Sequence, residues 1–209
     1  MFRSFEDIAA SYGNCGKIQF TNISAGETVS FPAFITQFSD NYTVGYGGEQ
    51  VFGRTDPVKH YQSTARNIQA SLDIVSFSAD NAEENFKKYS KLIRMLYPVY
   101  STKIASANNA RTIKAPPLWR IKYANYIKGD HPQGLLGVCS GFSFQPEFDM
   151  GHHITSEGDL VPMIYSMNLT YEPIHESPLG YEEGSSGTFI NKKFPYNMIL
   201  PPGSSGLPL

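Results

Sequence analysis

The chain has 209 residues, with 17 basic and 19 acidic side chains and a net charge of −2. Hydrophobic residues make up 41% and aromatic residues 13% of it, which excludes a chain that is disordered throughout. Proteins that bind nucleic acid through its phosphates normally carry a basic excess, so the acidic balance argues against that class.

Alternation of hydrophobic and polar residues with a period of two recurs along the chain and predicts half-buried strands. In chain order the predicted strands are 17–23, 28–38, 42–52, 67–74, 119–124, 138–145 and 163–172. The segment 53–62, which contains Asp56-Pro57, is predicted to be a loop. The sequence therefore predicts a mainly β protein.

One helix is predicted at about 80–97. Asp80 and Glu83 have the spacing of a capping box, and Pro98 ends the pattern. The apolar side chains at helical spacing are predicted to pack on the sheet, and they are Phe86, Tyr89, Ile93 and Leu96.

The C-terminal part of the chain, 173–209, differs in composition from the rest. Pro, Gly and Ser supply 16 of its 37 residues, yet it also contains Phe189, Phe194 and Tyr196. Isolated aromatics in such a segment indicate an extended arm that docks in pieces on another surface, and we expect the arm to serve assembly. The alternative is an arm that packs on its own domain or stays disordered. The predicted domains are thus 1–172 and an arm at 173–209.

The sequence contains few signs of catalysis or of a bound cofactor. Cys15 and Cys139 are too few for a disulfide scaffold or a four-cysteine zinc site, and we expect reduced thiols. Asp56 and His60 are residue types that can form an acid–base pair, but no nucleophile signature accompanies them. We therefore expect no enzyme activity, catalytic residue, metal site or cofactor, and a hydrolase using these two residues is the last alternative.

No apolar run is long enough for a membrane helix, and acidic residues stand at 6–7 where a signal peptide would be apolar. The expected place of synthesis is therefore a reducing cytoplasm, with no membrane partner.

An ordered set of motifs resembles the tail and baseplate proteins of tailed bacteriophages. The set comprises the run 51–68 with Gly53-Arg54 and Asp56-Pro57, then Leu96-Tyr97-Pro98, Pro116-Pro117-Leu118, and the ending Glu172–Tyr181. The resemblance implies a tail-tube-like fold, with two packed antiparallel sheets or a partly closed β-barrel and one flanking α-helix. It also implies a hexameric ring, in the baseplate hub or at the start of the tail tube, through which tape measure protein and DNA pass.

The partners implied are other copies of the chain, tail tube and baseplate proteins, and the tape measure protein, in a virion assembled in the host cytoplasm. DNA would pass transiently, without sequence-specific binding. A tail terminator, and a small β-sandwich module that binds carbohydrate or protein, are the alternatives. The residues expected at assembly interfaces are Arg54, Asp56, Lys59 and Tyr61 in the loop, and Phe189, Phe194 and Tyr196 in the arm.

Overall fold

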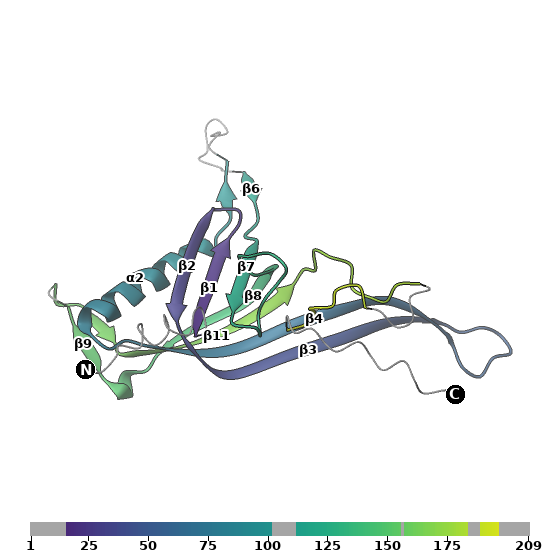
Figure 1. Cartoon of the computed structure of the whole chain (residues 1–209), viewed down its shortest axis with the longest axis horizontal. Coiled ribbons are helices and arrows are strands. Elements are labelled where there is room, and N and C mark those ends of the chain that lie inside the picture. Colours follow the sequence, from purple (N-terminus) through teal and green to yellow (C-terminus); the bar gives the residue numbers. More distant parts are fainter. Residues whose placement is uncertain (1–15, 102–111, 156, 184–188, 197–209) are drawn as a thin grey trace.

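A computed structural model describes residues 16–101, 112–155, 157–183 and 189–196 of the chain. This part is mainly antiparallel β-sheet with one α-helix, as the sequence predicted (Figure 1). The strands of the main sheet are β1 (Lys17–Asn22), β2 (Glu27–Pro32), β3 (Phe34–Glu49), β4 (Val58–Val75), β7 (Trp119–Tyr123), β8 (Leu135–Pro146) and β11 (Ile164–Pro173).

The seven strands follow the order β2-β1-β7-β8-β11-β4-β3, and every neighbouring pair is antiparallel. The edge strands β2 and β3 are separated in the chain by Ala33 alone, so the sheet curls until its two edges meet at that corner. The Tyr123 hydroxyl donates a hydrogen bond to the Ala33 carbonyl over 3.2 Å. No ladder joins β2 to β3 in the described strands, and the curled sheet is not closed into a barrel.

Two shorter ladders flank the main sheet. β5 (Val99–Tyr100) pairs with β6 (Ile113–Ala115), and β9 (His152–Ile154) pairs with β10 (Leu160–Pro162). A short 3₁₀ turn, Phe148–Met150, precedes β9. These ladders extend the molecule at its margins and leave the main sheet to form the core.

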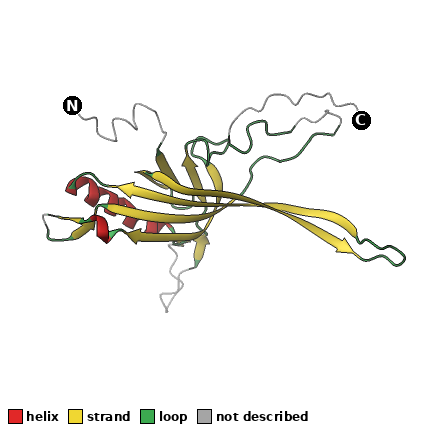
Figure 2. Ribbon diagram, turned by 90° about the horizontal axis from the view of Figure 1, so that it is seen from below, coloured by secondary structure: helices red, strands yellow, loops and turns green. Residues whose placement is uncertain are grey.

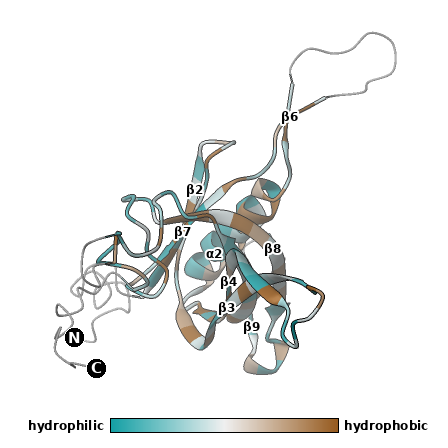
Figure 3. Ribbon diagram, turned by 90° about the vertical axis from the view of Figure 1, so that its right-hand side faces the viewer, coloured by the Kyte–Doolittle hydropathy of each residue, from teal (hydrophilic) through white to brown (hydrophobic). Residues whose placement is uncertain are grey.

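The core lies on the inner side of the curled sheet, where hydrophobic residues alternate with hydrophilic ones along the strands (Figure 3). Its largest fully buried side chains include Trp119, Tyr171 and Phe20. The Tyr171 hydroxyl lies 2.7 Å from the Leu135 carbonyl oxygen and 3.0 Å from that of Trp119, so this buried polar group is hydrogen-bonded. Gly137 allows β8 to approach β11, because a Cβ there would lie 2.3 Å from the Glu172 carbonyl oxygen.

The helix α2 (Ala79–Met95) packs against the sheet near β2 and against β9 and β10. Its N-cap is Ser78, two residues before the predicted cap, because the Ser78 side chain accepts the hydrogen bond from the Asn81 amide. The predicted capping box at Asp80 and Glu83 is therefore wrong.

The predicted buried face of this helix is confirmed at Tyr89 and Leu96 and wrong at Phe86. The residues that the sheet covers are Ala82, Asn85, Leu92 and Met95, with Tyr89 and Leu96 beside them. Phe86, which was expected in the core, is 41% exposed, and Ile93 is half-buried. Two apolar stripes run along this helix, and only the position of the sheet determines which one is buried.

Strands β3 and β4 form a hairpin that extends far beyond the rest of the molecule (Figure 1), and Figure 2 shows it as a twisted two-stranded ribbon. The ladder runs from Phe34 opposite Asp73 to Glu49 opposite Val58, with β-bulges near Ile35 and Gly45. The prediction that 53–62 is a loop is wrong from Val58 onward, because cross-strand pairing with β3 holds 58–62 in extended conformation.

Candidate assembly surfaces

One face of the hairpin continues the core side of the sheet out into solvent. On β4, Ile68 and Leu72 belong to the buried core. Arg66 is the last buried residue of that face, and every residue of β4 from Val58 to Ala65 is exposed. Because side chains alternate along a strand, Thr64 lies on the same face, beyond the point where the core ends.

We give the name aromatic strip to four side chains on this face, which are Tyr42, Val44, Tyr46 and Tyr61. Residues opposite each other in antiparallel strands share a face, and the register places Tyr42 opposite Arg66 and Val44 opposite Thr64. Tyr46 lies opposite Tyr61, with ring centroids 6.1 Å apart. The Tyr61 and Thr64 hydroxyl oxygens are 2.8 Å apart, so the face continues across the β-bulge.

Beyond Tyr42, which Phe194 of the arm partly covers, the aromatic strip is uncovered apolar surface. Tyr46 is 61% exposed and Tyr61 is 60% exposed. A two-stranded ribbon is marginally stable in water, and burial of one large apolar side chain contributes about 1.5–3 kcal/mol. Covering this strip would therefore stabilise both the hairpin and a complex that contains it.

The tip of the hairpin, residues 50–57, presents further apolar and charged groups. Phe52 is fully exposed, and Gly53 has a φ of 84°, a conformation that favours glycine. Arg54 and Asp56 are exposed and form no ion pair with each other in the described part of the chain. Lys59 follows on β4, opposite Gly48. These predicted interface residues thus come together at the tip, where a second molecule can reach them.

The predicted acid–base pair is not assembled. His60 is a strand residue opposite Gly47, and its ring occupies the space over that glycine, where a Cβ would lie 2.2 Å from Nε2. No hydrogen bond between His60 and Asp56 is present among the described residues, since Asp56 lies in the tip. The geometry gives no support to the hydrolase alternative.

The other side of the sheet along β3, β4, β8 and β11, which we call the polar face, consists mostly of uncharged polar side chains. Alternation and register place on it Ser39, Asn41, Thr43 and Gly45 of β3, Ser63, Ala65, Asn67, Gln69, Ser71 and Asp73 of β4, Ser166, Asn168 and Thr170 of β11, and Gly141, Ser143 and Gln145 of β8. By the same alternation Glu172 of β11 and Glu49 of β3 also lie on this side, so its charged residues on the four described strands are the acidic Asp73, Glu172 and Glu49, and none of these positions holds lysine or arginine.

Hydrogen bonds join the polar face across three strands. The Ser71 hydroxyl donates to Asn168 Oδ1 over 2.7 Å, and Asn168 Nδ2 donates to Ser143 Oγ over 3.1 Å. The Ser166 hydroxyl lies 2.8 Å from Asp73 Oδ1. The side chains therefore satisfy one another along the sheet and form a continuous hydroxyl and amide surface.

A buried ion pair marks the root of the hairpin. Arg66 donates from Nε and Nη2 to the two carboxylate oxygens of Asp40 over 2.9 and 2.7 Å. The Arg66 and Asp40 side chains are 1% and 4% exposed. The Tyr42 hydroxyl also donates to Asp40, over 3.1 Å. Desolvation raises the pKa of Tyr42, although Arg66 opposes the shift, so the phenol stays protonated and remains a donor.

The described part of the arm packs on this root. Phe194 lies over the Arg66 guanidinium, and the Tyr196 hydroxyl donates to Asp40 over 3.0 Å. Phe189 stacks on Phe194 with ring centroids 6.0 Å apart. The three arm residues expected at an interface thus contact one another or their own domain here, and desolvation raises the pKa of Tyr196 as it does that of Tyr42.

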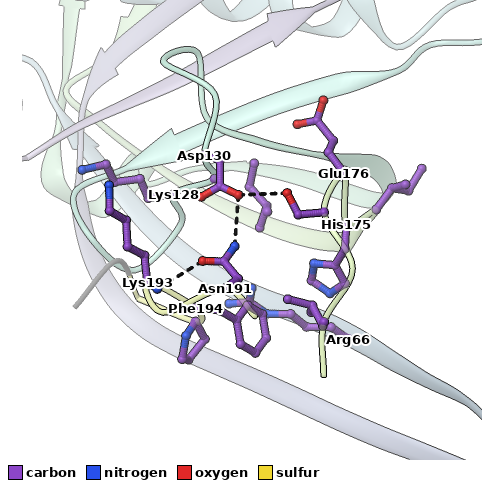
Figure 4. Close-up of a pocket in the computed structure, with 14 residues that line it drawn as sticks. Arg66, Lys128, Asp130, His175, Glu176, Asn191, Lys193 and Phe194 are labelled. Atoms are coloured by element: carbon purple, nitrogen blue, oxygen red, sulfur yellow. Dashed lines mark hydrogen bonds between the residues drawn. The ribbon is translucent and has the colours of Figure 1, made fainter. Parts of the chain in front are cut away.

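A second ion pair lies behind the arm. Arg120 on β7 donates to both carboxylate oxygens of Glu176, over 2.7 and 2.6 Å, and this pairing lowers the pKa of Glu176. A cavity of about 40 Å³ separates this region from Arg66 (Figure 4). Asp130 at its wall accepts hydrogen bonds from Ser177 and Asn191, as Figure 4 shows.

Sequence reasoning missed the Asp40–Arg66 pair and the polar face. The alternating Asn67, Gln69 and Ser71 carried a signal for the face, since their hydrophobic neighbours were recognised as core positions. No local signal pointed to the ion pair, because its partners are 26 residues apart.

Comparison with protein-family models and with curated protein sequences finds no match to this chain. Within the described residues, no group of histidine, cysteine, aspartate and glutamate side chains is arranged to hold a metal ion. In the same residues, no helix is both long enough and apolar enough to span a membrane.

Proposed function

We propose that the protein is a structural subunit of a phage tail, which forms a ring in the baseplate hub or at the start of the tail tube. The observation that carries this proposal is the hairpin, whose core-side face continues beyond the domain as the uncovered aromatic strip. A surface built like a core but left without a cover is typical of a protein that completes its packing on another subunit.

The edges of the main sheet support a ring of identical copies. β2 and β3 each pair on one side only among the described strands, so each presents unpaired backbone donors and acceptors. The two edges differ from each other, so a contact of β3 in one copy with β2 in the next is heterologous. Repeated contacts of this kind close into a ring when the rotation fits. Six copies are the number that the resemblance to tail proteins implies.

The polar face supports a role as the wall of a channel. Lysine and arginine hold DNA by neutralising its phosphates, and the positions of this face on β3, β4, β8 and β11 lack both residues. A neutral or weakly acidic wall of hydroxyls and amides lets a polyanion slide without being retained. In the proposed ring this face lines the lumen for the tape measure protein and DNA, while the aromatic strip contacts a neighbouring copy or the adjoining tube.

The mass of the purified full-length protein tests the proposal. Mass photometry over a range of concentrations should give closed rings, or a monomer that binds the ends of preformed tail tubes in a co-sedimentation assay. A monomer that joins neither rings nor tubes would contradict the proposal. Retention of such a monomer on a glycan array would favour the carbohydrate-binding module, and binding to the head-proximal end of tubes would favour a tail terminator.

A matched pair of variants links assembly to the aromatic strip. Tyr46→Ser/Tyr61→Ser should abolish ring or tube binding, because it removes two exposed aromatics without touching the core. Thr43→Ala/Ser63→Ala changes the opposite face of the same ribbon and should assemble normally. Equal assembly by the two variants would show that the aromatic strip is not the interface.

A further inference from the structure

The root of the hairpin is the point that determines where the projecting ribbon lies relative to the sheet. Beyond Arg66 neither β3 nor β4 has a neighbouring strand other than its partner among the strands that the structure describes, because the β11 ladder on β4 ends at Ile68. A two-stranded ribbon without further strands or packing is only marginally stable in water. Its direction must therefore be held at the root by contacts from outside the two strands.

Residues 189–196, which we call the strap, supply those contacts. The Phe194 ring lies 5.4 Å from the Arg66 guanidinium carbon and 6.2 Å from the Tyr42 ring, so it covers one residue from each strand. The Tyr196 hydroxyl bonds to Asp40 on β3. The strap thus contacts both strands of the hairpin at the last buried step before the ribbon leaves the domain.

The strap is anchored to the body on its other side. Asn191 Nδ2 donates to Asp130 over 3.0 Å, and the Tyr196 ring packs against Tyr126, both in the segment between β7 and β8. The Phe194 ring meets His175, which follows β11, with centroids 5.5 Å apart (Figure 4). These contacts connect the hairpin root to two separate parts of the body.

We propose that the strap is a conformational clamp that fixes the direction of the β3–β4 hairpin. It holds the buried Asp40–Arg66 pair from outside and transmits the rigidity of the sheet to the ribbon. The proposal concerns the isolated chain and does not depend on the ring. The arm thereby serves assembly indirectly, by presenting the aromatic strip and the tip in one orientation.

The strap lies outside the hydrophobic core. Among the residues that the structure describes, the buried core contains none from the strap. Phe189, Phe194 and Tyr196 are all half-buried. Loss of the strap should therefore release the hairpin and leave the folded sheet intact.

Distance measurements between spin labels test the clamp in the full-length protein. One label is placed at the tip with Phe52→Cys and the other on α2 with Lys87→Cys, in a background of Cys15→Ser and Cys139→Ala. Phe194→Ala/Tyr196→Ala should broaden the distance distribution, and Tyr196→Phe, which removes only the bond to Asp40, should broaden it less. Lys192→Ala is the control, because this strap residue is exposed and forms no ion pair among the described residues, and its distribution should match the parent.

Amide hydrogen exchange on the same variants gives a second readout. The double variant should exchange roughly tenfold faster at 42–46 and 61–66, with β7 and β11 unchanged. An unchanged distance distribution would overturn the proposal. Faster exchange throughout β7 and β11, or failure of the double variant to fold, would also overturn it, because the strap would then be part of the core.

Discussion

The Tyr196 hydroxyl donates a hydrogen bond to the Asp40 carboxylate across 156 residues of sequence. The same carboxylate receives two bonds from Arg66 and one from Tyr42. A carboxylate with four donors is well compensated for its burial, and the guanidinium beside it has its charge paired. The root of the hairpin is therefore a polar network enclosed by aromatic rings, and its stability depends on keeping the network complete.

Breaking this network from one side should be costly. Asp40→Leu leaves the Arg66 guanidinium buried without its partner and should lower the free energy of unfolding by about 3–5 kcal/mol. The double variant Asp40→Leu/Arg66→Met removes both charges and should recover most of that loss. Urea denaturation measures the free energy of unfolding of both variants. A double variant as unstable as the single one would show that the loss of charge pairing is not the main cause of the destabilisation.

The orientation in which α2 packs on the sheet predicts which of its apolar side chains stabilises the core. Leu92 is 1% exposed, so Leu92→Ala should lower the free energy of unfolding by about 2–5 kcal/mol. Ile93→Ala removes a half-buried side chain on the next position and should cost less than half as much. Thermal or urea unfolding of the two variants measures the difference, and the reverse order would restore the face that the sequence predicted.

The Arg120–Glu176 pair predicts a pH dependence of stability. Hydrogen bonding to Arg120 lowers the folded-state pKa of Glu176 from its ordinary value of 4.5. The stabilisation is thus complete above that value and is lost as the pH falls through the lowered pKa. Since Glu176 is partly exposed, Glu176→Gln should reduce the free energy of unfolding by about 1 kcal/mol at neutral pH.

The difference between Glu176→Gln and the parent should shrink toward zero as the pH falls below the lowered pKa of Glu176, because the parent carboxyl then also becomes neutral. Denaturation series in urea at several pH values measure it. A difference that stays constant as the pH falls through that pKa would mean that the ion pair does not contribute.

Arg54 at the tip predicts an effect on assembly without an effect on folding. It is exposed and has no ion-pair partner among the described residues, so Arg54→Ala should leave the melting temperature unchanged. If the tip contacts a neighbouring subunit, ring formation or tube binding should weaken by about 1 kcal/mol or more. Arg94→Ala on α2 is the matched control, and equal assembly of the two variants would exclude Arg54 from the interface.

Local alternation in the sequence predicts most strands of the main sheet. The predicted strands 17–23, 119–124 and 163–172 correspond closely to β1, β7 and β11. Alternation with a period of two is a local property of the chain, and it is found in strands that have one buried face and one face exposed to solvent. The same reasoning predicted a single α-helix and its approximate place, since the apolar spacing and Pro98 are also local.

The tertiary structure alone decided which faces are covered. The alternation continues through Tyr42, Val44 and Tyr46 as if a core lay beneath them, yet the domain ends at Arg66 and leaves the strip exposed. Likewise, the choice of Leu92 over Ile93 and the meeting of Tyr196 with Asp40 depend on contacts between distant segments. A sequence period records that a face is apolar, whereas only the path of the chain in space determines what covers it.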